Sequence, residues 1–136
     1  MKDKKRKYIL MIILLGVLML LSGCVRKECE EKVKDLEFTV TKEEELPEAL
    51  RQQIEKKRGF RFTYSDNEYL YVARGYGIQE TGGYSISVED CYLSDTAICV
   101  KTRLQGPENG EEVTKAPSYP FIVLKLELRE EEVLFQ

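Results

Sequence analysis

The sequence predicts a mainly β domain of the α+β kind, an antiparallel β-sandwich or half-open barrel of six to seven short strands with one N-terminal amphipathic helix. Two observations support this prediction. After residue 59, apolar and polar residues alternate in short runs, which is the period of a half-buried strand. Before residue 60, one segment combines helical spacing with suitable charges at both ends. Residues 36–136 are expected to form a single domain, since a chain of this length can bury one core.

The helix is expected between residues 43 and 59. Its apolar positions recur with helical spacing, at Leu46, Ala49, Leu50 and Ile54. Acidic residues 43–45 and Pro47 mark the start, and basic residues 56–58 mark the end, so the charges complement the helix dipole. Gly59 is expected to end the helix in the left-handed conformation. Packing of the apolar stripe on the protein's own sheet is favoured over docking on a partner.

The strands follow from alternation and from turn residues between the runs. We expect a hairpin around the turn at 65–67 and a second one around Ser94-Asp95-Thr96. In the strand 121–129, Ile122, Leu124, Leu126 and Leu128 are expected to face inward. Residues 105–118, with Gly-Pro and Asn-Gly pairs, predict a loop. The expected strands are residues 36–40, 60–64, 69–74, 84–92, 97–104, 121–129 and 133–135.

The N-terminus has the layout of a signal peptide, with five basic residues in the first seven and then the apolar run Tyr8 to Leu21. As a helix this run covers roughly 21 Å, which is less than the roughly 30 Å hydrocarbon core of a bilayer. Leu21-Ser22-Gly23-Cys24 resembles the lipobox of bacterial lipoproteins. That resemblance implies cleavage before Cys24 and a diacylglyceryl group on its sulfur; the alternative is a structural cysteine behind an ordinary signal peptide. We therefore expect a signal peptide over 1–23, a charged solvated tether over 24–35 and a lipid-anchored protein outside the bacterial cytoplasmic membrane.

The composition argues against several function classes. Residues 1–23 hold five of the 21 basic and one of the 24 acidic residues, so the rest of the chain has 16 against 23, a net charge of −7. Nucleic acid is therefore an unfavoured partner. The chain contains no histidine, no zinc motif, no P-loop and no GxGxxG sequence. We expect no enzyme, no catalytic residue, no cofactor and no metal, and we interpret Glu89-Asp90 and Glu111-Glu112 as chance neighbours on an acidic surface.

Three cysteines besides Cys24 remain, at positions 29, 91 and 99. Cys91 and Cys99 flank the turn at 94–96, so a disulfide across the hairpin and two free thiols are both compatible with the sequence. Cys29 lies in the expected tether and has no predicted role.

The segment 75–86 is the most informative part of the domain, because it has four glycines within nine residues. One interpretation is a long connection in which Tyr76 and Tyr84 lean on the sheet, and the residues alone modestly favour it. The other is a protein-binding loop, in which glycine-framed tyrosines supply rigid contact area. The candidate binding residues are Gly75, Tyr76, Gly77, Thr81, Gly82, Gly83 and Tyr84.

Tyr69 to Gly77, Thr81 to Ile86 and Pro120 to Lys125 together resemble the PrcB family, over roughly residues 60–135. The resemblance implies an accessory subunit that associates with and stabilises a cell-surface serine protease complex, with an envelope protease or another protein as partner. A second likeness is that Glu80 to Tyr84 is similar to the loop of chagasin-type inhibitors, which are immunoglobulin-like sandwiches that insert this loop into a cysteine-protease cleft. The proline and second threonine of that motif are missing here, so the accessory subunit ranks above the inhibitor, and an enzyme of another kind ranks third.

Overall fold

The structure is a computed structural model that describes residues 2–20 and 26–136. The chain begins with helix α1 (Lys2–Leu20), which contains most of the apolar run. Among the described residues, no helix has both the length and the apolar character needed to cross a membrane. Cys24 and the three residues before it lie outside the described residues, so the predicted lipidation site has no structural description here.

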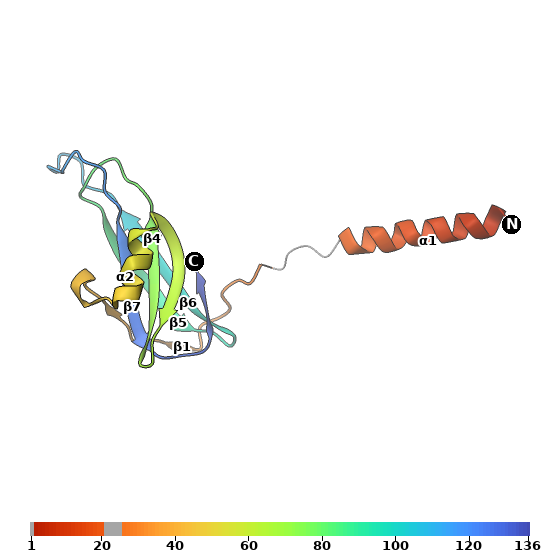
Figure 1. Cartoon of the computed structure of the whole chain (residues 1–136), viewed down its shortest axis with the longest axis horizontal. Helices are drawn as coiled ribbons and strands as arrows, with labels where there is room; N and C mark the ends of the chain where they lie inside the picture. Colours follow the sequence, from red (N-terminus) through yellow and green to blue (C-terminus); the bar gives the residue numbers. More distant parts are fainter. Residues whose placement is uncertain (1, 21–25) are drawn as a thin grey trace.

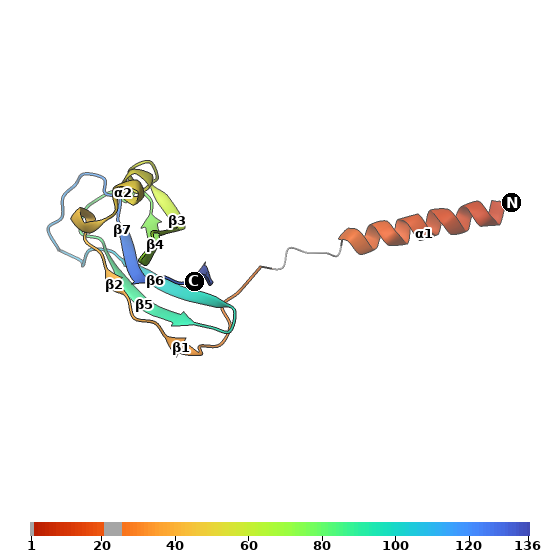
Figure 2. The same ribbon diagram turned by 60° about the horizontal axis from the view of Figure 1, so that its bottom comes forward.

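Two four-stranded sheets form the domain, which confirms the predicted β-sandwich-like α+β fold (Figures 1 and 2). Sheet A has the order β1 (Lys34–Asp35), β5 (Ser85–Leu93), β6 (Ala97–Gln105) and β8 (Glu132–Phe135). Sheet B has the order β2 (Thr39–Val40), β7 (Phe121–Glu127), β4 (Tyr69–Tyr76) and β3 (Gly59–Ser65). Neighbouring strands pair antiparallel, except that β8 runs parallel to β6.

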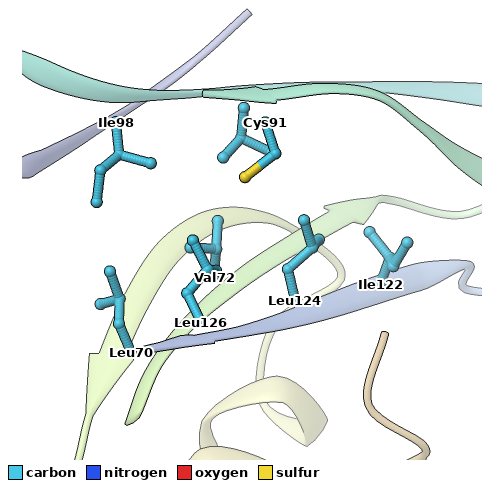
Figure 3. Packing of buried hydrophobic residues seen from close by; sticks show 8 residues of the cluster. Leu70, Val72, Cys91, Ile98, Ile122, Leu124 and Leu126 are labelled. Atoms are coloured by element: carbon cyan, nitrogen blue, oxygen red, sulfur yellow. The ribbon is translucent and has the colours of Figure 1, made fainter. Parts of the chain in front are cut away.

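The space between the sheets holds the main core (Figure 3). Sheet A contributes Cys91, Ile98 and Val100, and sheet B contributes Leu70, Val72, Ile122, Leu124 and Leu126. Because side chains alternate between the two faces of a strand, the odd-numbered neighbours on β4 and β7 point to the other face of sheet B. The predicted inward face of β7 is confirmed through Leu126, but Leu128 is 44% exposed because the strand ends at Glu127.

A second core lies on the outer face of sheet B under helix α2 (Glu48–Glu55), which follows the short 3-10 helix η1 (Glu43–Glu45). The buried residues of this core are Leu46, Leu50, Ile54, Phe60, Tyr71, Ala73 and Val123. The predicted helix and its packing on the protein's own sheet are thus confirmed, although Ala49 is exposed.

Two local expectations are corrected. Gly59 does not end the helix in the left-handed conformation, because it is already the first residue of β3 and pairs with Tyr76. Of the expected first strand over residues 36–40, only Thr39 and Val40 form a strand, which is β2 in sheet B, and β1 in sheet A precedes the expected segment. The chain crosses from sheet A to sheet B between them, so their side chains do not share one face.

Both predicted hairpins are present, and their turns lie at one end of the sandwich, here called the turn end (Figure 1). The Asp66 carboxylate accepts hydrogen bonds from the backbone N–H groups of Glu68 and Tyr69, which lowers its pKa. The buried Ser94 hydroxyl accepts one from the Ala97 N–H at 3.1 Å. Residues 77–84 and 106–120 lie at the opposite end, here called the loop end.

Residues 26–33, here called the strap, cross the outer face of sheet A before β1. A disulfide joins Cys29 to Cys99, whose Cα atoms are 5.9 Å apart. The Tyr92 hydroxyl donates to the Glu30 carbonyl, and the Val33 N–H donates to the Leu93 carbonyl. The segment predicted as a solvated tether therefore lies against the domain from Cys29 onward.

The disulfide between Cys91 and Cys99 that one interpretation allowed is not formed. Cys91 pairs with Val100 while Cys99 pairs with Tyr92, so the two cysteines point to opposite faces of sheet A. Cys91 is a free thiol in the core between the sheets, where burial raises its pKa to about 11. Cys99 faces outward to meet Cys29.

Candidate functional site

The loop end is an ordered pair of segments in which residues 77–82 run beside residues 114–120. Gln79 and Ser118 exchange two backbone hydrogen bonds of 2.9 and 3.0 Å. Further along, the Gly82 N–H donates to the Thr114 carbonyl, and the Ser118 hydroxyl donates to the Thr81 carbonyl. This irregular ladder continues β4 and β7 beyond the sandwich, so side chains on it have defined positions.

A β-bulge lies where the ladder leaves sheet B. On the side of the bulge next to sheet B, the Tyr76 N–H donates to the Pro120 carbonyl. On the side next to the loop, Gln79 pairs with Ser118. Gly77 and Ile78 therefore oppose Tyr119 alone. Gly77 has a φ of 76°, the left-handed conformation expected at the first position of a glycine bulge. Its N–H donates to the Arg58 carbonyl, which attaches the bulge to the end of the α2 segment.

The bulge turns two large apolar side chains toward solvent. Ile78 is 56% exposed and Tyr119 is 43% exposed. The guanidinium of Arg58 lies over the Tyr119 ring, 5.0 Å from its centroid, which is a cation–π contact. We call Arg58, Ile78 and Tyr119 the bulge patch. Tyrosine and arginine are enriched among the residues that dominate binding energy in protein interfaces, so the chemistry of this patch suits a protein partner.

The first three predicted binding residues lie under or beside this patch. Gly75 is buried, and a Cβ at this position would meet the Phe60 ring at 2.5 Å. The Tyr76 hydroxyl shares a hydrogen bond of 2.5 Å with the Thr102 hydroxyl, and the Arg74 guanidinium lies 4.0 Å from the Tyr76 ring centroid. Burial lowers the pKa of Arg74. Gly75 and Tyr76 thus pack within the fold, while Gly77 shapes the bulge.

The other four predicted residues, Thr81, Gly82, Gly83 and Tyr84, hold the two loop segments together. Gly82 lies against Thr114, and the ring of Tyr84 lies against Gly106. This arrangement agrees with the interpretation in which the tyrosines lean on neighbouring structure. Their role in binding stays a prediction.

We expect Gly83→Ala to destabilise the loop end, because Gly83 has a φ of 85° and an added Cβ would lie 2.5 Å from a Val113 methyl group. Gly110→Ala is the matched control, since Gly110 has a similar φ of 84° but open space around it. In both variants, alanine in a positive-φ conformation should lower the free energy of unfolding by about 1 kcal/mol. Gly83→Ala adds the clash with Val113. In thermal unfolding, the melting temperature should fall further for Gly83→Ala than for Gly110→Ala. Equal decreases would contradict the packing of Gly83 against Val113.

The paired carboxylates have structural partners. Glu89 forms ion pairs with Lys101 and Arg103, while Asp90 pairs with Lys32 of the strap at 3.0 Å. Glu111 accepts a hydrogen bond from the Glu108 N–H. In the described ranges 2–20 and 26–136, no three cysteine, aspartate or glutamate side chains gather as a metal site would require. Glu89, Asp90 and Glu111 thus have structural partners, and the absence of catalysis, cofactor and metal stays a prediction.

Comparison with known families identifies the region that contains this site. Residues 70–127 match the family model PrcB C-terminal. This match supports membership of the PrcB family and agrees with the resemblance carried by the 69–77, 81–86 and 120–125 segments. No curated protein and no solved structure matches the chain.

The PrcB C-terminal match runs from the second residue of β4 to the last residue of β7, so it includes both loop segments and the strands that support them. Of the bulge patch, Ile78 and Tyr119 lie within the match and Arg58 precedes it. Sequence reasoning selected the glycines and tyrosines of this region and missed all three patch residues. Ile78 had a detectable signal, since it is a large aliphatic residue in a segment rich in glycine and polar residues.

Proposed function

We propose that this chain is a surface-tethered, non-catalytic lipoprotein that serves as an accessory or stabilising subunit of a cell-envelope protease complex. The observation that carries the proposal is the match of residues 70–127 to the PrcB C-terminal family, because this region builds the loop end and its exposed residues. We further propose that the bulge patch contacts the partner, since its side chains are exposed, its backbone is fixed by hydrogen bonds, and it includes a tyrosine and an arginine, two of the residue types that dominate interfaces. The lipid on Cys24 would keep the domain at the membrane surface.

The inhibitor alternative has less support from the site. The Gly82 N–H already donates to the Thr114 carbonyl, so it is not available to a protease, and Gly83 lies against Val113 and Pro107. An inhibitor would block a purified cysteine protease and lose that effect on Tyr84→Ala, and this assay distinguishes it from an accessory subunit.

The partner is tested by affinity capture of the full-length lipidated protein from detergent-solubilised membranes of its own host, followed by mass spectrometry. We expect a protease in stoichiometric amount, and we expect Ile78→Ser to weaken its binding by about tenfold or more, as for a residue central to an interface. Leu128→Ser is the matched control, because Leu128 is an apolar residue of 44% exposure at the turn end. Absence of a protease from the wild-type capture would overturn the subunit proposal. If Ile78→Ser and Leu128→Ser retained the same amount of protease, the role of the patch would be overturned.

Lipid attachment is tested separately by metabolic labelling with a radioactive fatty acid. We expect Cys24→Ala to abolish incorporation and Cys91→Ala to retain it, because Cys91 is buried in the core. Labelling that persists in Cys24→Ala would contradict the lipid anchor.

A further inference from the structure

The strap covers apolar residues on a face of sheet A that would otherwise meet solvent. Ala97, Cys99 and Tyr92 are nearly or fully buried, at 2%, 0% and 8% exposure. On this outer face, the disulfide holds the strap at Cys99, and the Tyr92 hydroxyl is hydrogen bonded to both Glu30 and Gln136. The strap is therefore fixed to the domain by these bonds, although its residues other than Cys29 are exposed.

The attachment point lies near the turn end. Cys99 is the third residue of β6, directly after the turn at 94–96, and Lys27 forms an ion pair of 2.7 Å with Glu132, which pairs with Ala97. From Cys99 to the last residue of β6 the strand rises by roughly 20 Å, at about 3.3 Å per residue. Figure 1 shows residues 77–84 and 106–120 beyond that, at the loop end, and these segments contain Ile78 and Tyr119 of the bulge patch.

The disulfide also sets the length of chain between Cys24 and the domain. Five residue steps separate Cys24 from Cys29, which span at most about 18 Å when fully extended. Without the disulfide, only the exposed Lys27–Glu132 ion pair and the hydrogen bond from Tyr92 to Glu30 would hold the strap before Val33. The first backbone–backbone hydrogen bond to sheet A is that of Val33, nine steps from Cys24 and up to about 32 Å away. The crosslink thus nearly halves the maximum length of free chain between Cys24 and the domain, and it fixes that chain at one place on the sandwich.

We propose that the Cys29–Cys99 disulfide orients the domain on the membrane, with the turn end beside the bilayer and the bulge patch facing away from it, toward a partner that stands above the membrane surface. Because the free chain from Cys24 to Cys29 is shorter than the sandwich, it keeps the turn end close to the lipid headgroups. In the reduced protein, the longer free chain would allow either the turn end or the loop end to approach the headgroups. This inference rests on the proposed lipid attachment at Cys24.

The test measures energy transfer from the full-length lipidated protein, reconstituted in phosphatidylcholine vesicles, to acceptor-labelled lipid headgroups. A fluorescent amino acid is placed by codon suppression at Asp95 at the turn end or at Glu108 at the loop end; both residues are exposed. We expect severalfold more efficient transfer from position 95 than from position 108. In the Cys29→Ser background, we expect the difference between the two positions to shrink strongly.

Vesicle flotation of Cys24→Ala separates this inference from the one on which it depends. If Cys24→Ala still floats with the vesicles, the lipid anchor is wrong. If it does not float, yet positions 95 and 108 transfer equally in the wild type or keep their difference in Cys29→Ser, the orienting role of the disulfide is wrong. Retained secondary structure of Cys29→Ser by circular dichroism excludes unfolding as the cause of any change.

Discussion

We expect Cys29→Ser to lower the free energy of unfolding by about 4 kcal/mol, because the disulfide closes a loop between residues 70 positions apart and so restricts the unfolded chain. Cys29 is the better position to change, since it is only partly buried whereas Cys99 is fully buried and packed under the strap. Urea denaturation of the purified chain in detergent, followed by circular dichroism, measures the change.

The control for this prediction is a reducing agent. Reduction should lower the stability of the wild type by the same amount and should leave Cys29→Ser unchanged. A wild-type protein whose denaturation midpoint does not respond to full reduction, verified by thiol counting, would show that the crosslink contributes nothing to stability.

The second large effect is expected for Leu124→Ala, with a loss of about 2–5 kcal/mol, as found for large-to-small changes in well-packed cores. Leu124 has no exposed surface and lies at the middle of β7, where it pairs with Val72 and packs in the core between the sheets (Figure 3). Truncation would leave a cavity that two hydrogen-bonded sheets cannot easily close.

Leu128→Ala is the matched control, because it removes the same atoms four residues further along at a position of 44% exposure. We expect it to change stability by no more than about 0.5 kcal/mol. Denaturation midpoints measured with unchanged slopes would establish both values. Similar losses in the two variants would contradict the end of β7 at Glu127 and the burial of Leu124.

The strands after residue 59 were predictable because each carries its own local signal. The alternation over 60–64 and 69–74, with turn residues between them, led to the hairpin of β3 and β4. The same reasoning located β5, with an irregularity that the structure shows as a bulge between Val88 and Asp90. The parallel pairing of β8 with β6 had no local signal, because strand direction depends on the path of the chain between sheets.

The candidate site was predictable only in its location. Four glycines within nine residues indicated an unusual backbone over 75–84, and Gly77 and Gly83 do have positive φ. Tyr76 is hydrogen bonded to Thr102 and the Tyr84 ring lies against Gly106, and their role as contact residues stays a prediction. The exposed residues Ile78 and Tyr119 come from segments 41 positions apart, and one extra residue at the bulge places Gly77 and Ile78 opposite Tyr119.

By itself the sequence determined the mainly β fold, the presence of helix α2 and the resemblance to the PrcB family. These features follow from periodicity, from charges at the helix ends and from short motifs, which are all local properties of the chain. Tertiary structure alone decided the pairing of Cys29 with Cys99. Position along the chain left a pairing with Cys91, eight residues from Cys99, and two free thiols both open. The antiparallel register places those two side chains on opposite faces of sheet A, so the partner of Cys99 had to come from whatever covers the outer face, and that is the strap.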